Sequence, residues 1–268
     1  MPTNLSATTY EKWFRALFVG PTGRGKTIAA ASWPGKTLVI DFDDRHRPII
    51  DWFPDRLSDY DIESIHADNF WTVLKPLMNR LRQLNPYTNI ICDGITSMSN
   101  TTIMTQMMIK GGFENWFQRS KEDTKGSKIT AGGIMVPGWD EFNGEAMLMS
   151  LILEMLRSFK CNLFVTAHPV ARTRIEGTKA VKYSSLVTFG PKIESIIPTY
   201  FDEVWYFDYE VVANSDGTTR IKRTVHTAPS DDYMEAKTAL KVPAVIDYTD
   251  KNLYDLVKEY LATKELVV

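Results

Sequence analysis

Length, composition and charge define the broad class of this 268-residue chain. Its hydrophobic fraction of 44% and charged fraction of 24% are typical of soluble globular proteins, which excludes a disordered, collagen-like or coiled-coil chain. The formal net charge is −2, so any binding of nucleic acid has to use a local basic surface. We expect a single α/β domain over residues 1–268, with its core at about 13–240.

Cysteine usage and the apolar runs indicate the compartment. Cys92 and Cys161 each lie in a short apolar run that is typical of a buried strand, so we expect two free thiols. The first six residues lack the basic and apolar stretches of a signal peptide, and no run approaches 18 apolar residues. We therefore expect a cytoplasmic protein with no membrane partner.

Short β-rich apolar runs alternate along the chain with longer runs of helical spacing. In chain order, the expected elements are strand 13–19, helix 26–32, strand 37–42, strand 62–66, helix 70–84, strand 89–93, helix 98–109, helix 141–159 and strand 162–167. Such alternation is typical of parallel βαβ units, and several of these strands are apolar on both faces. The pattern predicts a mostly parallel central sheet flanked by helices.

The pattern changes after residue 200. Segments 201–212 and 218–227 are strand-like and flank a turn-forming Asn-Ser-Asp-Gly sequence, which predicts an antiparallel hairpin at the sheet edge. Apolar residues at helical spacing predict a closing helix over 251–263. Segments 110–138 and 169–190 have the weakest regular pattern, so we expect two long loops, which in compact domains are usually functional.

The most specific motif is GPTGRGKT at residues 20–27, which matches G-x-x-x-x-G-K-[ST] between an expected strand and an expected helix. In this motif the backbone N–H groups surround a β-phosphate, Lys26 bridges the β- and γ-phosphates, and the Thr27 hydroxyl ligates Mg²⁺. The alternative is a chance glycine-rich turn, which would arise in on the order of one chain in a hundred. The predicted ATP-binding residues are Gly20, Pro21, Thr22, Gly23, Arg24, Gly25, Lys26, Thr27 and Ile28.

Polar residues follow three of the expected strands, where the ligands of open α/β sheets bind. Asp93 ends strand 89–93 and is predicted to hold the metal with Thr27; alternatively it caps the next helix. Asp43, or its neighbour Asp44, is predicted to polarise the attacking water; alternatively both are solvated loop acids. His168 follows strand 162–167 and is predicted to sense the γ-phosphate, with a structural role as the alternative.

The ordered motifs GPTGRGKT, VIDFDD, IICDGITS and LFVTAHP, followed by a basic loop and a hairpin, resemble the RecA-like ATPases. The closest resemblance is to compact phage-encoded RecA-like ATP-binding proteins, some of which anneal single strands. It implies that the water-activating acid, typically Glu, is here the shorter Asp43, and that His168 is the polar sensor. It also implies a ring or filament in which Lys222 or Arg223 reaches the neighbouring subunit's ATP, and a host-cytoplasmic location if the chain is phage-encoded.

Two segments carry concentrated basic charge. Segment 169–192 holds five cations against Glu176 alone, and the predicted DNA-binding residues Arg172, Arg174, Lys179 and Lys182 are among them, together with Lys192. Segment 110–128 holds five cations against three acids and interleaves them with Phe113, Trp116 and Phe117, a combination suited to a single-strand groove. The alternative is two solvated loops whose aromatics pack on the domain.

These observations predict a Mg²⁺-dependent ATPase that binds single-stranded DNA and serves recombination, annealing or replication. Two other functions stay open at this point. One is a P-loop phosphotransferase, although no arginine-bearing lid is evident. The other is a scaffold that binds ATP, scarcely hydrolyses it and acts through assembly, which the shorter Asp43 favours.

Overall fold

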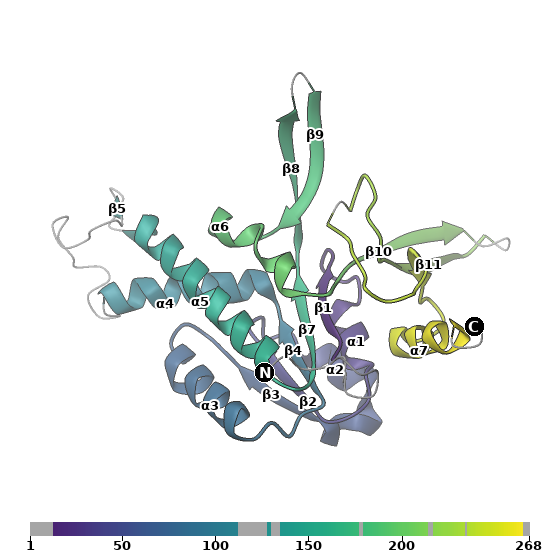
Figure 1. Ribbon diagram of the computed structural model, residues 1–268, viewed down its shortest axis with the longest axis horizontal. Helices are drawn as coiled ribbons and strands as arrows, with labels where there is room; N and C mark the ends of the chain where they lie inside the picture. Colours follow the sequence, from purple (N-terminus) through teal and green to yellow (C-terminus); the bar gives the residue numbers. More distant parts are fainter. Residues whose placement is uncertain are drawn as a thin grey trace, which may run out of the picture.

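The computed structural model describes residues 13–111, 128–129, 135–176, 179–213, 217–233 and 235–264. Its centre is an eight-stranded sheet in the order β12-β11-β10-β1-β7-β4-β2-β3 (Figure 1). The six strands from β10 to β3 are parallel, and β11 and β12 are antiparallel additions at one edge. The expected α/β class, with a mostly parallel sheet and a C-terminal hairpin, is confirmed.

The strands of the main sheet follow the apolar runs closely. They are β1 (Arg15–Val19), β2 (Thr37–Asp41), β3 (Tyr60–Ser64), β4 (Asn89–Asp93), β7 (Asn162–Ala167), β10 (Glu203–Ala213), β11 (Thr219–His226) and β12 (Val245–Asp247). β2 and β4 are buried along their whole length, which accounts for their apolar residues on both faces. β3 begins two residues before the expected start at residue 62.

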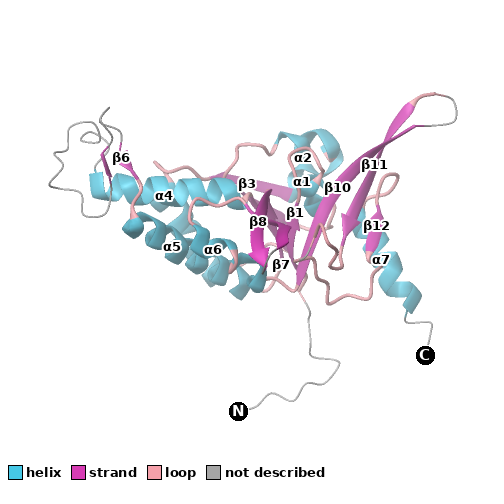
Figure 2. Ribbon diagram, turned by 90° about the horizontal axis from the view of Figure 1, so that it is seen from above, coloured by secondary structure: helices cyan, strands magenta, loops and turns pink. Residues whose placement is uncertain are grey.

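Helices cover both faces of the sheet (Figure 2). They are α1 (Lys26–Ala31), α2 (Arg47–Trp52), η1 (Pro54–Asp59), η2 (Phe70–Leu74), α3 (Lys75–Gln83), α4 (Ile95–Gly111), α5 (Trp139–Ser158), α6 (Pro191–Glu194), η4 (Ile197–Tyr200) and α7 (Leu253–Lys264). Alternate residues of β1 enter two separate cores: Leu17 packs with α3 and α5, and Phe18 packs with α1 and α7. Among the described residues, no helix has the length and apolar character needed to cross a bilayer.

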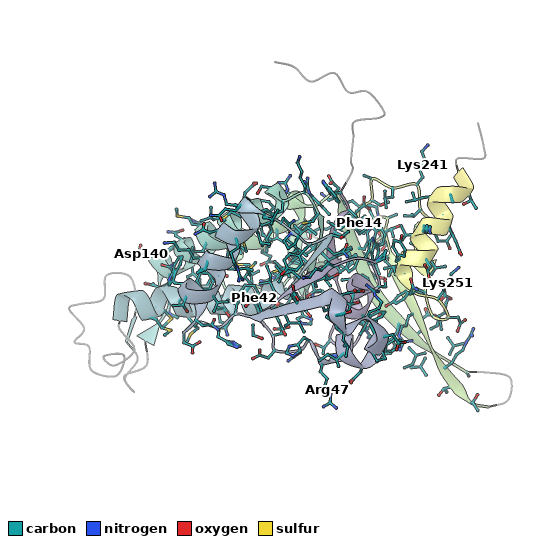
Figure 3. The ribbon with its side chains drawn as sticks, turned by 90° about the horizontal axis from the view of Figure 1, so that it is seen from below. Phe14, Phe42, Arg47, Asp140, Lys241 and Lys251 are labelled. Atoms are coloured by element: carbon teal, nitrogen blue, oxygen red, sulfur yellow. The ribbon has the colours of Figure 1, made fainter. Side chains whose placement is uncertain are left out.

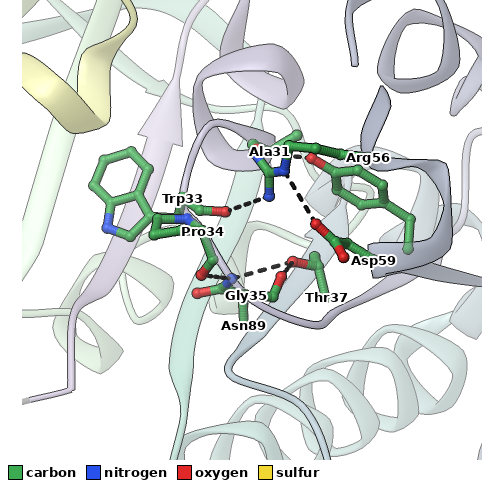
Figure 4. Close-up of polar contacts among 9 residues, drawn as sticks. Ala31, Trp33, Pro34, Gly35, Thr37, Arg56, Asp59 and Asn89 are labelled. Carbon is green, nitrogen blue, oxygen red and sulfur yellow. Dashed lines mark hydrogen bonds and ion pairs between the residues drawn. The ribbon is translucent and has the colours of Figure 1, made fainter. Parts of the chain in front are cut away.

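Helix α1 is short, and its last turn is held by side chains from other elements (Figure 4). Arg56 donates to the carbonyl oxygens of Ala31 and Trp33, at 3.3 and 2.9 Å, and the Tyr60 hydroxyl donates to Ala31 at 2.8 Å. The end of a helix leaves carbonyl groups without intrahelical partners, so these donors satisfy what a six-residue helix cannot. The network therefore fixes the helix that follows the glycine-rich loop.

The expectation of a long loop at 169–190 is wrong. Strands β8 (Pro169–Glu176) and β9 (Lys179–Leu186) form an antiparallel hairpin that projects away from the main sheet (Figure 1). Backbone hydrogen bonds pair the two strands of a projecting ribbon whatever its side chains, so the strands need not show the apolar alternation of core strands. The expected loop at 110–138 lies largely outside the described residues, which include a short pair, β5 (Lys128–Ile129) and β6 (Met135–Val136).

Candidate active site

The glycine-rich segment 20–27 connects β1 to α1 at the carboxyl end of the parallel strands. Gly25 has φ +84° and stands directly before α1, where a side chain would be strained and would approach the Tyr248 hydroxyl to 3.2 Å. At Gly20 an added Cβ would come within 2.6 Å of the Phe207 carbonyl oxygen on β10. The loop thus lies against its neighbours so closely that these two positions require glycine.

Lys26 is the first residue of α1, and only 7% of it is exposed. Its Nζ donates to the carbonyl oxygens of Gly20 and Pro21, at 2.7 and 3.0 Å, so the ammonium group lies under its own loop. Burial lowers the Lys26 pKa to about 8, although the nearby carboxylates of Asp93 and Asp43 act in the opposite direction. The loop therefore holds a cation whose burial outweighs the compensation that these carboxylates provide.

Asp93 ends β4 and is shared by two hydroxyl groups. The Thr27 Oγ1 donates to Asp93 Oδ2 at 2.8 Å, and the Thr166 Oγ1 on β7 donates to Oδ1. The predicted pair of Thr27 and Asp93 is thus brought together, because β7 is the single strand between β1 and β4. Sequence reasoning missed Thr166, and the signal was a polar residue inside the otherwise apolar strand LFVTA.

Asp43 follows β2 and reaches the same cluster, whereas its neighbour Asp44 does not. The Ser97 hydroxyl, just inside α4, donates to Asp43, and burial followed by the charge of Asp93 raises the Asp43 pKa. A Cβ added at Gly94 would lie 3.2 Å from Asp43 Oδ2 and from Thr166 Oγ1, which shows how closely these groups converge. Asp44 is exposed and its carboxylate lies 3.3 Å from the His66 Nε2.

His168 lies half-buried immediately after β7, beside the glycine-rich loop. Its Nδ1 is 3.2 Å from the Gly20 carbonyl oxygen, so the ring contacts the loop that also holds the Lys26 ammonium. Burial, and then the charge of Lys26, lowers the His168 pKa. The imidazole is therefore neutral at neutral pH and can donate or accept a hydrogen bond. Its role as a sensor stays a prediction.

One cavity of about 620 Å³ joins these groups, a size typical of small-molecule sites. Lys26, Thr27, Asp43, Asp93 and His168 all line it, as do the glycine-rich loop residues Thr22, Gly23 and Gly25. Arg24 is absent from this lining, because its guanidinium lies over the Tyr209 ring, 3.3 Å from the centroid. Sequence reasoning also missed Arg45, which lines the cavity and follows the DFDD motif directly.

The two basic residues expected to act on a neighbouring subunit lie on β11. Arg223 lines the cavity of its own chain, and the Lys222 Nζ lies 3.8 Å from the Glu210 carboxylate across the hairpin. The position of Arg223 allows a role within its own subunit. A role toward a neighbouring subunit stays a prediction for both residues.

The predicted DNA-binding residues lie on the projecting hairpin. Arg172 on β8 forms an ion pair with Glu194, with Nη2 to Oε2 at 2.9 Å and Nε to Oε1 at 3.2 Å. Arg174, Lys179 and Lys182 belong to β8 and β9, but their side chains lie outside the described residues. Lys192 donates to Asn143 and lies 5.4 Å from the centre of the Trp139 ring. Two of the five cations of this segment therefore have partners within the chain.

The family assignment agrees with this geometry. The model of the AAA domain family matches residues 13–239, so the chain belongs to this family of P-loop ATPases, which generally use ATP with Mg²⁺. The resemblance to P-loop ATPases is thereby confirmed at the family level, and the match does not extend to the phage-encoded RecA-like group. No curated protein matches the sequence.

Proposed function

We propose that this protein binds and hydrolyses Mg²⁺-ATP at the cavity between the glycine-rich loop and the ends of β2, β4 and β7. The observation that supports this most directly is the hydrogen bond between Thr27 and Asp93, two residues 66 positions apart in the sequence. A hydroxyl and a carboxylate held together beside a buried lysine form the arrangement that P-loop ATPases use around a nucleotide.

The residues at the cavity suit a magnesium ion that arrives with a nucleotide. Mg²⁺ prefers oxygen ligands and is usually bound by one or two protein groups, with phosphates and water completing its shell. Thr27 Oγ1 and Asp93 Oδ2 provide such oxygens. Among the described residues, no group of three or more His, Cys, Asp or Glu side chains could hold a metal without further ligands. Bound Mg²⁺ would neutralise charge that develops on the phosphate oxygens.

The side chains of the site have separable roles in the proposed hydrolysis. Lys26 exchanges the carbonyl oxygens of Gly20 and Pro21 for phosphate oxygens, and the anion compensates its buried charge. Asp43 orients the attacking water and accepts its proton, and its raised pKa makes it a stronger base than an exposed aspartate. Thr166 holds Asp93 from the side opposite Thr27, which fixes the carboxylate toward the metal.

The first test replaces the buried cation. Lys26→Ala should reduce phosphate release from Mg²⁺-ATP by at least a hundredfold, because it removes a charge that stabilises the transferring phosphoryl group. The measurement is steady-state phosphate release, with circular dichroism to verify folding. The matched control is Lys75→Ala, which changes an exposed lysine on α3. Full activity in Lys26→Ala would refute the site.

We also propose that the β8–β9 hairpin binds single-stranded DNA. The support is its basic sequence and its position: it projects from the molecule and begins one residue after His168, at the cavity (Figure 1). An exposed basic ribbon is suited to contact phosphates, and its link to β7 offers a route by which nucleotide state could affect binding. Recombination, annealing or replication would then be the processes served.

The second test neutralises three cations of this hairpin. Changing Arg174, Lys179 and Lys182 to Gln should weaken binding to a fluorescent single-stranded oligonucleotide. The slope of log K against log salt concentration should become less negative by about two, because each phosphate contact contributes about 0.7 to this slope for single strands. The measurement is fluorescence anisotropy from 50 to 200 mM salt. Neutralising Lys75, Arg80 and Arg82 on α3 removes the same charge from another surface and should leave affinity unchanged. Equal losses in both variants would contradict the hairpin site.

Assembly is a related proposal. The RecA-like resemblance implies a homo-oligomeric ring or filament, and a scaffold that binds ATP with little turnover remains the alternative function. Phosphate release with and without single-stranded DNA, measured alongside the molecular mass, separates these outcomes from acceptor-dependent phosphotransfer. Turnover stimulated by single-stranded DNA favours the DNA-dependent ATPase, whereas assembly without turnover favours the scaffold.

A further inference from the structure

The cavity extends well past the residues that would surround phosphates. Beyond Thr27 and Ile28 it continues between two walls. One wall is α2 and the residue after it, with Pro48, Trp52 and Phe53. The other wall consists of Arg223 on β11 and residues 248–253, between β12 and the start of α7. Figure 3 shows Arg47 on α2 and Lys251 near the beginning of α7.

Residues 248–253 of the second wall lie outside the family match, which ends at residue 239. The wall is nevertheless integral to the fold, because Ile246 of β12 and Leu253 and Val257 of α7 are buried in the core that contains α1. In Figure 2, β12 and α7 lie close together at the edge of the sheet. This segment therefore adds a wall to the cavity that the family region alone does not supply.

The same segment contacts the glycine-rich loop directly. The Tyr248 hydroxyl donates to the Arg24 carbonyl oxygen at 2.6 Å, and the Tyr248 backbone N–H donates to the Arg223 carbonyl oxygen at 3.0 Å. Thr249 accepts a hydrogen bond from the Arg223 N–H at 2.9 Å. Residues 248 and 249 are thus fixed between the loop and β11, so the wall is positioned before any ligand binds.

The first wall presents an aromatic surface to the cavity. Trp52 is 59% exposed although it lines the cavity, and the Arg223 guanidinium lies 5.9 Å from the centre of its ring. Tryptophan side chains are on average highly buried in folded proteins. An exposed indole beside a cation is instead suited to stacking with a flat ligand. His46, just before α2, is held by the buried Asp41 at 2.8 Å, which anchors this wall to β2.

We propose that residues 248–253 and Trp52 form the nucleobase half of the site, and that this half favours purine nucleoside triphosphates. This inference rests on the proposed function, because the triphosphate defines which end of the cavity receives the base. A purine offers a larger face than a pyrimidine for contact with the indole, so stacking favours ATP and GTP over CTP and UTP. Arg223 stabilises the stack from within the same subunit.

The experiment separates the two halves of the site with two ligands. Trp52→Ala should weaken binding of a slowly hydrolysed ATP analogue by about tenfold, because base stacking on an aromatic side chain contributes on the order of 1–3 kcal/mol. The same variant should bind inorganic triphosphate with unchanged affinity. Both dissociation constants are measured by isothermal titration calorimetry of the full chain with Mg²⁺. Trp52→Phe should recover most of the affinity for the ATP analogue.

A control variant and a comparison of purine with pyrimidine nucleotides complete the experiment. Trp139→Ala changes a tryptophan that is 72% exposed on α5 and does not line the cavity, so it should leave both affinities unchanged. In Trp52→Ala the preference for purine over pyrimidine nucleotides should disappear. Equal weakening of both ligands, or no weakening of either, would overturn the inference while leaving the phosphate site intact. If the wild type bound neither the ATP analogue nor inorganic triphosphate, the proposed function would be overturned instead.

Discussion

At the scale of single residues, the site is defined by polar groups that already have partners within the chain. The Lys26 ammonium is bound by two loop carbonyl oxygens, and Asp93 accepts from hydroxyl groups on α1 and β7. Burial of such groups costs free energy unless they are hydrogen-bonded, so these contacts stabilise the loop when no nucleotide is bound. Charge is still compensated incompletely at Lys26, as its lowered pKa shows.

The Lys26 pKa leads to a prediction about stability without nucleotide. Its folded-state pKa of about 8 lies below the value of 10.5 expected when unfolded, so the unfolded chain binds more protons between these values. The group therefore destabilises the fold below pH 8, and stability rises as pH increases from 8 toward 10.5. Between pH 7 and 9.5 the gain should be about 2 kcal/mol.

Replacing Lys26 with Met isolates this contribution. Urea unfolding at pH 7 and 9.5 gives the free energy of unfolding for both proteins, and the pH dependence of the wild type should exceed that of Lys26→Met by the stated amount. The difference between the two proteins reports on Lys26 together with its effect on the titration of its neighbours His168 and Asp43. An identical pH dependence would mean that the buried ammonium is fully compensated by its carbonyl partners and nearby carboxylates.

At the scale of elements, the central feature is β7, which lies between the strand before the glycine-rich loop and the strand that ends in Asp93. It delivers Thr166 to Asp93 and His168 to Gly20, and then continues into the β8–β9 hairpin. One strand therefore contacts both the Asp93 carboxylate and the loop. Its polar residue at a buried position is explained by the partner on the neighbouring strand.

This position of β7 predicts the effect of Thr166→Val. The substitution preserves shape but removes the hydroxyl that holds Asp93 Oδ1. The rate of phosphate release at saturating ATP should fall about tenfold, because a carboxylate held from one side only is less well oriented. Thr166→Ser, which retains the hydroxyl, serves as the control and should retain most of the rate. An unchanged rate in Thr166→Val would show that Thr27 alone fixes Asp93.

At the scale of the whole molecule, the sequence predicted what depends on local pattern. The strands that flank the site were predictable because they are apolar on both faces, and the loop because its glycines and lysine have fixed spacing. The approach of Thr27 to Asp93 followed from the general rule that parallel strands end at the same edge. Asp43 could be proposed beside Asp44, but only the geometry distinguishes them.

Features that depend on tertiary context could not be predicted in the same way. The β8–β9 hairpin pairs mainly through its own two strands, and its sequence lacks the apolar alternation of the core strands, so its segment resembled a loop. The helix α2 has six residues and one buried side chain, too little for helical periodicity to be visible. Tyr248 lies 224 positions from Arg24, and nothing in the local sequence connects the two.

The pairing of the lysine and the aspartate with their own chain has a consequence for selectivity. A triphosphate that binds the Lys26 ammonium displaces the carbonyl oxygens of Gly20 and Pro21, so for these two hydrogen bonds it gains only the difference between old and new partners. The indole of Trp52 gives up no such partner among the hydrogen bonds described here. A ligand that also carries a base should therefore bind more tightly than free phosphate or a short polyphosphate.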